Sequence, residues 1–359
     1  MPRQRANIRE IARLAKVSVA AVSYAMHGDP RSKLSESKRK EIQAICARLH
    51  YHPNENARRV FRKKSETIAF FFPPLVGNVY RTFVDQNFSY SLIGAQNELV
   101  RHGMDLLLVE ATPSFVREKR YLRLCRGGLI DGALLWGTLE DDSYVEELCG
   151  ENLPMVMLQS DLGNTLSVTC GDYSGVRMLT EHVLRAGHRK IAVVSPLMSS
   201  YYARRFLGGI ADALAEAGLH PRHVTGASGF DDTVAEPAVA EILECAADAT
   251  CIMAPNDIVA FGCIRALRKR GIRVPGDISI TGGAATFSSV DEFRLDAFRI
   301  PSREIGAAGA RLLCDLIAGK ESLKSIELPV EPVAGDSVAV PGSGRKAAAL
   351  RRVSRVKTF

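Results

Sequence analysis

The sequence predicts a small all-α helix-turn-helix headpiece followed by a larger α/β body of two lobes with parallel sheets. Three observations lead to this fold class. The first 64 residues hold three short segments of helical period and carry 16 Lys and Arg against five Asp and Glu. From residue 67 onward, short apolar stretches alternate with helical ones, as in parallel strands joined by helices. At 359 residues, the chain is too long for one ordinary core.

The composition excludes several classes of protein. Apolar residues make up 46% of the chain, so it is not disordered by composition. No apolar run approaches the roughly 20 residues that span a bilayer, and no apolar segment follows the basic N-terminus as in a secretory signal. The eight cysteines lack C-x-x-C spacing, which argues against a zinc site or a disulfide framework. We expect a cytoplasmic protein with no metal, no cofactor and no membrane partner.

The charge is strongly segregated along the chain. Residues 65–342 carry 25 Lys and Arg against 35 Asp and Glu, whereas residues 343–359 carry six basic residues and no acidic one. A small basic module attached to an acidic body is typical of nucleic-acid binding. A basic run can equally be an ordinary solvated surface. The residue pattern within the first 64 residues therefore has to distinguish nucleic-acid binding from this alternative.

That pattern is a helix-turn-helix. The first helix follows Asn7 and buries Ile8, Ile11, Ala12 and Ala15. The second follows Ser18, turns Val22, Ala25 and Met26 inward, and presents Ala20, Ser23, Tyr24 and His27 outward. The third follows Ser35 and buries Ile42, Ile45, Cys46 and Leu49. An outer face of small and polar residues suits entry into the major groove of DNA. An ordinary three-helix bundle would leave the net charge of this segment unexplained.

Two stretches, NIREIARLAKVSVAAVSYAMHG and LSESKRKEIQAICARLHYHPNENARRV, resemble the lactose/galactose-repressor family of bacterial transcription regulators. The resemblance implies that Val19, Ala20 and Tyr24 read base edges, while Asn7, Ser18 and Ser23 hold phosphates. His27 and Asn54 are further candidate DNA contacts. Val19 and Ala20 have no hydrogen-bond donor, so they offer only apolar contact, for example to a thymine methyl group.

Residues 54–62 predict a short basic helix that is too short to be stable alone in water. The resemblance implies that this segment is a hinge, ordered by a second subunit and DNA, with Val60 as the minor-groove wedge and Phe61 beside it. Arg58 would add a phosphate contact. The alternative is an ordinary linker with an exposed Val-Phe pair.

The body contains seven apolar strand candidates, at residues 67–73, 104–111, 132–137, 154–159, 190–196, 249–255 and 277–283. They predict two parallel sheets of about six strands, with a ligand cleft where the strand ends face each other. The common nucleotide-binding, hydrolase and zinc-protease motifs are missing, so an enzyme is disfavoured. The isolated pair Gly282-Gly283 indicates a turn or close packing, and Trp136 is expected in the core.

The body also resembles the effector domain of the same family, which is similar to periplasmic sugar-binding proteins. The matching motifs are LTEHVLRAGHRKIAVVS, RRFLGGIADALAEAGL, PNDIVAFGCIRALRKRGIRVPGDISITGG and PSREIGAAGARLLCDLIAG. The resemblance implies effector contacts at Arg205 and Asp257, although Asp257 could also be a helix cap. Two carboxylates common in the family are missing, so Asp172, Tyr201 and Arg204 are added as candidates. The effector is expected to be sugar-like or anionic, or missing altogether.

The predicted domains are residues 1–53 for the headpiece, 54–64 for the hinge, 65–342 for the body and 343–359 for a flexible basic tail. Lobe I is placed at about 65–160 and 297–322, and lobe II at about 161–296 and 323–342. The predicted function is a homodimeric transcriptional regulator, a repressor, that binds a near-palindromic operator and responds to a small molecule. The alternatives are a constitutive DNA-binding regulator with a vestigial cleft, and a solute-binding protein without a regulatory role.

Overall fold

The computed structural model describes residues 7–27, 34–51, 64–74, 85–163, 165–285 and 293–342. The chain divides into two compact units, Met1–Ser65 and Glu66–Phe359. Four candidate DNA contacts of the predicted hinge lie outside the described residues: Asn54, Arg58, Val60 and Phe61. The predicted basic tail at 343–359 also lies outside them.

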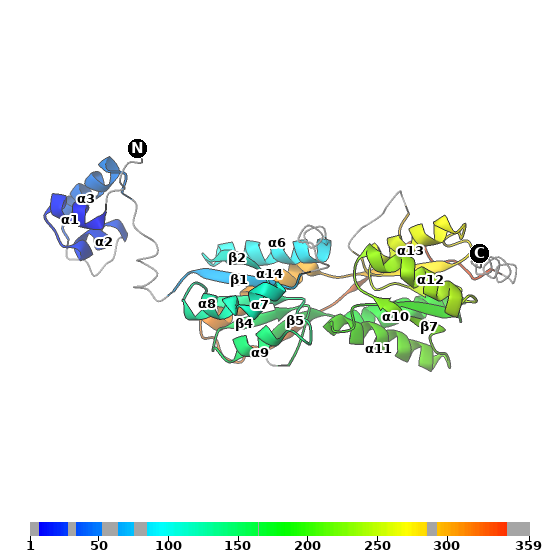
Figure 1. Ribbon diagram of the computed structural model, residues 1–359. Helices are drawn as coiled ribbons and strands as arrows, with labels where there is room; N and C mark the ends of the chain where they lie inside the picture. Colours follow the sequence, from blue (N-terminus) through cyan, green and yellow to red (C-terminus); the bar gives the residue numbers. More distant parts are fainter. Residues whose placement is uncertain are drawn as a thin grey trace. The chain divides into compact units, whose positions relative to one another are not determined.

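Within residues 7–27 and 34–51, the first unit is a cluster of three helices (Figure 1). Capping side chains set where these helices start. The helices are α1 (Ile8–Ala15), α2 (Val19–His27) and α3 (Glu36–Arg48). Asn7 caps α1 and Ser35 caps α3, each through a side-chain oxygen that accepts a backbone N–H. Lys16 ends α1 in the left-handed conformation, which turns the chain sharply toward α2.

All three helices contribute to one small apolar core. Its buried members are Ile11, Ala12, Ala15, Val22, Ala25, Ile42, Cys46 and Tyr51. Most of these residues lie on the faces that the helical periodicity marks as apolar. The headpiece is thus the helix-turn-helix that the sequence predicts, with one face of α2 turned to solvent.

The second unit begins with a six-stranded sheet in which every neighbouring pair is parallel, in the order β11-β5-β4-β3-β1-β2. Its strands are β1 (Thr67–Phe72), β2 (Asp105–Glu110), β3 (Gly132–Trp136), β4 (Met155–Leu158), β5 (Leu166–Cys170) and β11 (Ile326–Leu328). The helices of this lobe are α6 (Gln86–Arg101), α7 (Pro113–Arg117), α8 (Arg120–Arg126), α9 (Ser143–Cys149) and α14 (Ser302–Ile317). Alternate residues of β1 enter two different core clusters, so both faces of the sheet are covered.

The other sheet also has six strands, in the order β12-β10-β9-β8-β6-β7, and only the β10–β12 pair is antiparallel. Its strands are β6 (Ile191–Ser195), β7 (His223–Ser228), β8 (Cys251–Met253), β9 (Ser279–Ala285), β10 (Asp296–Arg299) and β12 (Glu331–Val333). The helices of this lobe are α10 (Asp172–Arg185), α11 (Tyr201–Glu216), α12 (Ala235–Cys245) and α13 (Asp257–Lys269), with a short 3₁₀ turn at Asp232–Val234.

The chain crosses between the two sheets three times, at Gly171, at Ile300-Pro301 and at Pro329-Val330. These crossings differ from the lobe boundaries at 160/161, 296/297 and 322/323 that the sequence suggests. The strands β5, β10 and β11 each lie on the other side of the nearest predicted boundary. They are short and interrupt the strand–helix rhythm, so the periodicity did not mark them as strands. Among the described residues, no helix is long and apolar enough to cross a membrane.

Candidate DNA-reading face and ligand cleft

The outward face of α2 is made of small and polar side chains. Val19 and Tyr24 are 42% and 41% exposed, Ala20 is exposed and Ser23 is half-buried. A helix with such a face can approach base edges closely, because no long side chain at its start holds it away. His27 is the last residue of the helix, and its side chain lies outside the described part of the chain.

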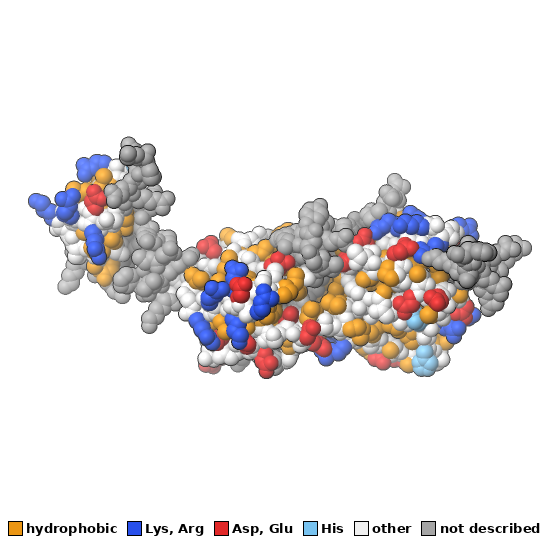
Figure 2. Space-filling view, viewed as in Figure 1, with side chains coloured by type: hydrophobic (Ala, Val, Ile, Leu, Met, Phe, Trp, Pro, Cys, Tyr) orange, Lys and Arg blue, Asp and Glu red, His pale blue; other side chains and the backbone are white. Residues whose placement is uncertain are grey.

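Two of the capping residues of the headpiece, Asn7 and Ser18, keep hydrogen-bonding capacity for a phosphate. The side-chain oxygen of Asn7 accepts from the N–H of Glu10 at 3.0 Å, and the hydroxyl of Ser18 accepts from Ala21 at 3.1 Å. The Asn7 amide and the Ser18 hydroxyl can still donate to an anion while they cap. Phosphates bind favourably at such helix starts because of the local N–H groups. Figure 2 shows several Lys and Arg side chains on the face of the headpiece that is turned to the viewer, with little acidic surface between them.

The second candidate site is a cavity of about 400 Å³ in the body. It lies at the carboxyl ends of parallel strands from both sheets, where doubly wound folds bind ligands. The sequence-predicted candidates Asp172 and Tyr201 line it. Much of the remaining wall is apolar or aromatic, from Pro73, Trp136, Leu139, Leu197, Tyr202, Phe230, Ile258 and Ile300.

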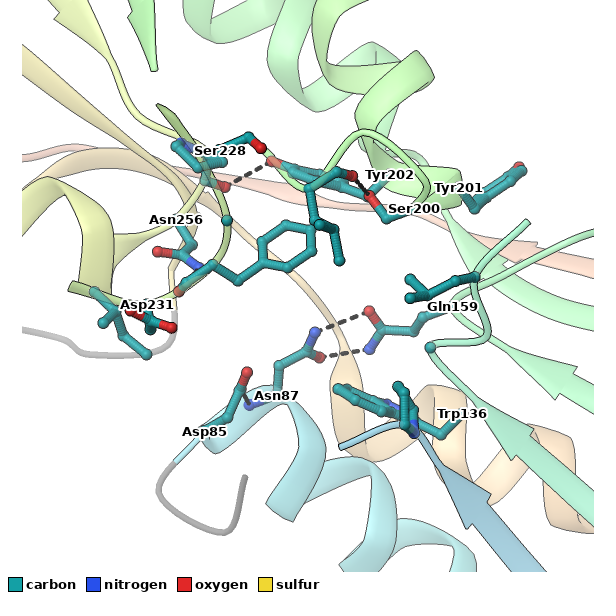
Figure 3. A pocket seen from close by; sticks show the side chains of 18 of the residues that line it. Asp85, Asn87, Trp136, Gln159, Ser200, Tyr201, Tyr202, Ser228, Asp231 and Asn256 are labelled. Atoms are coloured by element: carbon teal, nitrogen blue, oxygen red, sulfur yellow. Dashed lines mark hydrogen bonds between the residues drawn. The ribbon is translucent and has the colours of Figure 1, made fainter. Parts of the chain in front are cut away.

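On the first lobe, a pair of amides forms the polar part of the wall (Figure 3). The Asn87 side chain donates to the carbonyl oxygen of the Gln159 side chain at 2.9 Å, and Gln159 donates back. Ser302 also donates to the side-chain oxygen of Asn87. Gln159 has a φ of 56°, a left-handed conformation that is uncommon for a residue other than glycine. The amide pair therefore holds a strained backbone turn at the edge of the cavity.

On the second lobe, hydrogen bonds fix the aromatic and amide side chains. Tyr202 donates from its hydroxyl to the carbonyl of Pro255 at 2.8 Å, and burial raises its pKa well above the ordinary value. Its ring lies 6.0 Å from that of Phe230. Asn256 caps α13 and donates to the backbone carbonyl of Phe230 at 2.7 Å. This wall is therefore held in shape by its own contacts before any ligand arrives.

Asp172 is a buried carboxyl at the wall of the cavity, where the chain first crosses between the lobes. Burial raises the pKa of Asp172 to about 6, although the thiol of Cys170, 3.1 Å away, and the guanidinium of Arg205 both favour its ionised form. Glu327 acts in the opposite direction. Asp172 is thus poised to change its charge near neutral pH.

The two arginines proposed as effector contacts do not line the cavity. Arg205 donates to Glu327 at 2.6 Å, with its guanidinium 5.4 Å from the ring centre of Tyr201. Arg204 pairs with Glu140 at 2.7 Å. Both pairs join helix α11 of one lobe to the other lobe. The sequence could not reveal these pairs, because their partners are distant along the chain.

Asp257 does not line the cavity either, although its neighbours Asn256 and Ile258 do. Its side chain is 1% exposed and packs against β9. A Cβ atom at Gly282 would lie 2.8 Å from a carboxyl oxygen of Asp257, and one at Gly283 would lie 2.0 Å from the carbonyl of Pro255. Both glycines are therefore required by close packing.

The polar or aromatic lining residues that the sequence analysis missed as ligand contacts include Asp85, Asn87, Trp136, Gln159 and Asp231. A signal for some of them was available. Four of the seven predicted strands end at residues 73, 137, 159 and 255, and each of these four positions lines the cavity. The rule that ligands bind beyond the carboxyl ends of parallel strands could have located them.

A helix-turn-helix with a small-residue reading helix, on one chain with a two-lobed body that holds a ligand-sized cavity, defines a DNA-binding transcriptional regulator. Two family models match this chain: the bacterial regulatory proteins of the lacI family over residues 7–54, and the periplasmic binding protein-like domain over residues 180–338. The chain thus combines a helix-turn-helix domain of the lacI family with a periplasmic binding protein-like domain.

Known proteins resemble the chain over most of its length. The probable HTH-type transcriptional repressor ExuR of Bacillus subtilis is 28% identical over 323 residues, which cover 88% of this chain and 92% of that protein. The Lac repressor dimer bound to operator and an anti-inducer has a TM-score of 0.79 at 21% identity and covers 94% of this chain and 100% of its own. A LacI family regulator from Enterococcus faecium with bound ribose has a TM-score of 0.66 at 25% identity, and covers 77% and 100%.

Proposed function

We propose that this chain is a cytoplasmic, homodimeric repressor whose affinity for a near-palindromic operator is set by a small sugar-like molecule in the cavity of the body. The observation that carries the proposal is the presence of an exposed reading helix and a 400 Å³ cavity on one polypeptide. The bound ribose in the Enterococcus faecium regulator supports a sugar as the ligand class. Val19, Ala20 and Tyr24 read bases, while Asn7, Ser18 and Ser23 hold phosphates.

A homodimer is supported by an exposed apolar stripe on α6. Tyr90, Ile93 and Val100 lie on one side of this helix and are 45–61% exposed, and Leu107 on the neighbouring edge strand β2 is 36% exposed. Side chains of this kind are costly to leave in water, and a second copy of the chain would cover them. Two copies would also present two reading helices to the two halves of a palindrome.

The gap between the lobes provides a means of regulation. A ligand that contacts Asn87 or Gln159 of one lobe and Tyr202 or Asn256 of the other favours a particular arrangement of the lobes. A coupling free energy of about 1–3 kcal/mol between the ligand and DNA sites changes operator affinity 5- to 150-fold.

The test is a gel-shift assay of the full chain on the DNA upstream of its own coding region, repeated with a panel of sugars and metabolites. We expect retardation that resists random competitor DNA and changes with one class of metabolite. Retardation that no metabolite alters would favour the constitutive regulator. Binding of a metabolite with no preference for any duplex would favour the solute-binding alternative, and would overturn the proposal.

A further inference from the structure

The first turn of α2 exposes apolar side chains only. Residues 19–22 read VAAV, so none of their side chains carries a hydrogen-bond donor or acceptor. Val19 is 42% exposed and Ala20 is also exposed. The hydroxyl of Ser18, directly before this turn, already accepts from the N–H of Ala21 at 3.1 Å as the helix cap. The start of α2 therefore presents an apolar surface to solvent.

Packing within the headpiece keeps this surface on the outside. Val22 and Ala25, on the inner side of α2, are 0% and 1% exposed. The side-chain amide of Gln43 on α3 donates to the carbonyl of Ala25 at 3.3 Å and ties the two helices together. These contacts fix the rotation of α2 about its axis. Val19 is β-branched and has one strongly preferred rotamer in a helix, so its methyl groups hold fixed directions.

The charges around this surface favour DNA as its occupant. The first 64 residues carry 16 Lys and Arg against five Asp and Glu. Exposed cations lie on α1, at its end and on α3: Arg9, Arg13, Lys16, Lys40 and Arg48. Cations of this kind bind phosphates, while the first residues of the second helix of a helix-turn-helix contact base edges in the major groove. The apolar start of α2 is therefore the part of the headpiece that meets the bases.

The major groove offers one apolar group to such a surface, the methyl group on C5 of thymine. The other groups at the base edges are the acceptors of guanine, the acceptor and amino donor of adenine, and the amino donor of cytosine. Against an apolar side chain these polar groups lose water and gain no hydrogen bond, which is unfavourable. Burial of one methyl group instead favours binding about fourfold.

A second base, 5-methylcytosine, carries the same methyl group on the same carbon. It differs from thymine in the major groove at C4, where an amino donor replaces the carbonyl acceptor. A side chain needs a donor or an acceptor to detect this difference, and Val19 and Ala20 have neither. The next hydroxyl groups on α2, those of Ser23 and Tyr24, lie about 4.5–6 Å further along the helix axis than Ala20.

We propose that the headpiece is a reader of C5-methylated pyrimidines, in which Val19 and Ala20 accept thymine and 5-methylcytosine alike and reject unmodified cytosine. This inference rests on the proposed function and names the chemistry of its operator. Methylation of a cytosine within a half-site therefore strengthens binding without any change of base sequence. Cytosine methylation is then a second input to the regulator, independent of the small molecule in the body.

The test isolates a single methyl group. Selection from a random pool by the full chain gives the preferred half-site, and each thymine of that site is then replaced in turn by deoxyuridine, which lacks only the methyl group. At one or two adjacent base pairs of each half-site, we expect binding to weaken about fourfold. At the same pairs, 5-methylcytosine opposite guanine should bind about fourfold tighter than cytosine opposite guanine.

Variants locate the contact on α2. Val19→Thr keeps the branched shape but replaces one methyl group with a hydroxyl, and Ala20→Ser adds a hydroxyl. Each should reduce the effect of the base methyl group to less than about twofold at one base pair. The matched control is Leu14→Gln, which makes a 40% exposed apolar residue of α1 polar and should leave the effect unchanged. Circular dichroism of each variant checks that the helices are retained.

The outcomes separate this inference from the proposed function. Equal binding of thymine and uracil at every position of a preferred site would overturn the methyl reading and leave the regulator intact. Equal binding of cytosine and 5-methylcytosine, or a methyl effect that survives both Val19→Thr and Ala20→Ser, would also overturn it. A methyl effect without any response to metabolites would support the reading and remove the effector from the proposed function. If no duplex is preferred over random DNA, both proposals fail.

Discussion

On α2, the proposed roles of single side chains separate the affinity of DNA binding from its sequence selectivity. Ser23 is half-buried and carries a hydroxyl, whereas Ala20 is exposed and apolar. A hydroxyl that holds a phosphate contributes the same free energy on every sequence. A side chain at a base edge contributes only where the matching base is present.

We therefore expect Ser23→Ala to weaken binding about fivefold on all duplexes, since one hydrogen bond is worth about 1 kcal/mol. Ala20→Asn should instead change the preferred base at one position of each half-site. Selection of bound duplexes from a random pool would measure both effects, with Ser37→Ala on the exposed side of α3 as the control. An unchanged preference in Ala20→Asn would show that the docking register is wrong.

Asp172 predicts a pH-dependent stability. Its pKa in the folded protein is raised from 3.8 to about 6, so folding favours the protonated form. The stabilisation of the folded protein by this protonation is complete below about pH 4 and is lost as the pH rises through about 6. Burial is the largest cause of the raised pKa. Cys170 and Arg205 lower the pKa of Asp172, and Glu327 raises it.

Asp172→Asn removes the cost of burying the charge. We expect it to raise the free energy of unfolding by about 1–3 kcal/mol at pH 7.5 and by almost nothing at pH 4. Urea unfolding at both pH values measures this, with the exposed Asp212→Asn as the control. A variant that is less stable than the parent at pH 7.5 would contradict the prediction.

Ion pairs between elements hold the lobes at their crossings. The Arg205 guanidinium on α11 reaches Glu327 at 2.6 Å and the carbonyl of Cys170 at 3.5 Å, next to the first and third crossings. Arg205 thus holds the two chain crossings between the lobes in position. A residue that acts through Glu327 should lose its effect when Glu327 is changed first.

Arg205→Ala and Glu327→Gln should each increase amide hydrogen exchange at residues 326–328 several-fold. The double variant should show no further increase, because both changes remove the same contact. Arg204→Ala, whose partner is Glu140, should leave this segment unchanged. If only Arg205→Ala has an effect, the ion pair with Glu327 does not hold these crossings.

The elements also show which parts of the fold can be predicted from sequence. Seven apolar strands were predicted, and each overlaps a strand of the structure. Five strands were not predicted: β7 is largely polar at a sheet edge, and β5, β10, β11 and β12 have only three to five residues each. In the site, Asp172 and Tyr201 were predicted and line the cavity. Arg204 and Arg205 were predicted to contact the ligand, but their guanidinium groups pair with Glu140 and Glu327. These partners are distant along the chain, so no local sequence pattern reveals them.

At the scale of the whole molecule, assembly and DNA binding should depend on the same helix. Ile93→Glu together with Val100→Glu places two charges on the exposed stripe of α6, where a second copy would have to bury them. We expect a monomer in sedimentation velocity and at least 100-fold weaker operator binding. Leu129→Glu, at a residue that is 51% exposed elsewhere, adds a charge without either effect. A dimer that survives the double change would rule out this interface.

The late position of β11 and β12 in the chain has a consequence for synthesis. Each sheet gains one strand within residues 326–333, so neither lobe can complete its hydrogen bonding until the ribosome has made nine-tenths of the polypeptide. The apolar cluster of the headpiece, in contrast, ends at Tyr51. A nascent chain therefore acquires its DNA-reading part long before the part that senses metabolites, and a truncated translation product would retain the former without the latter.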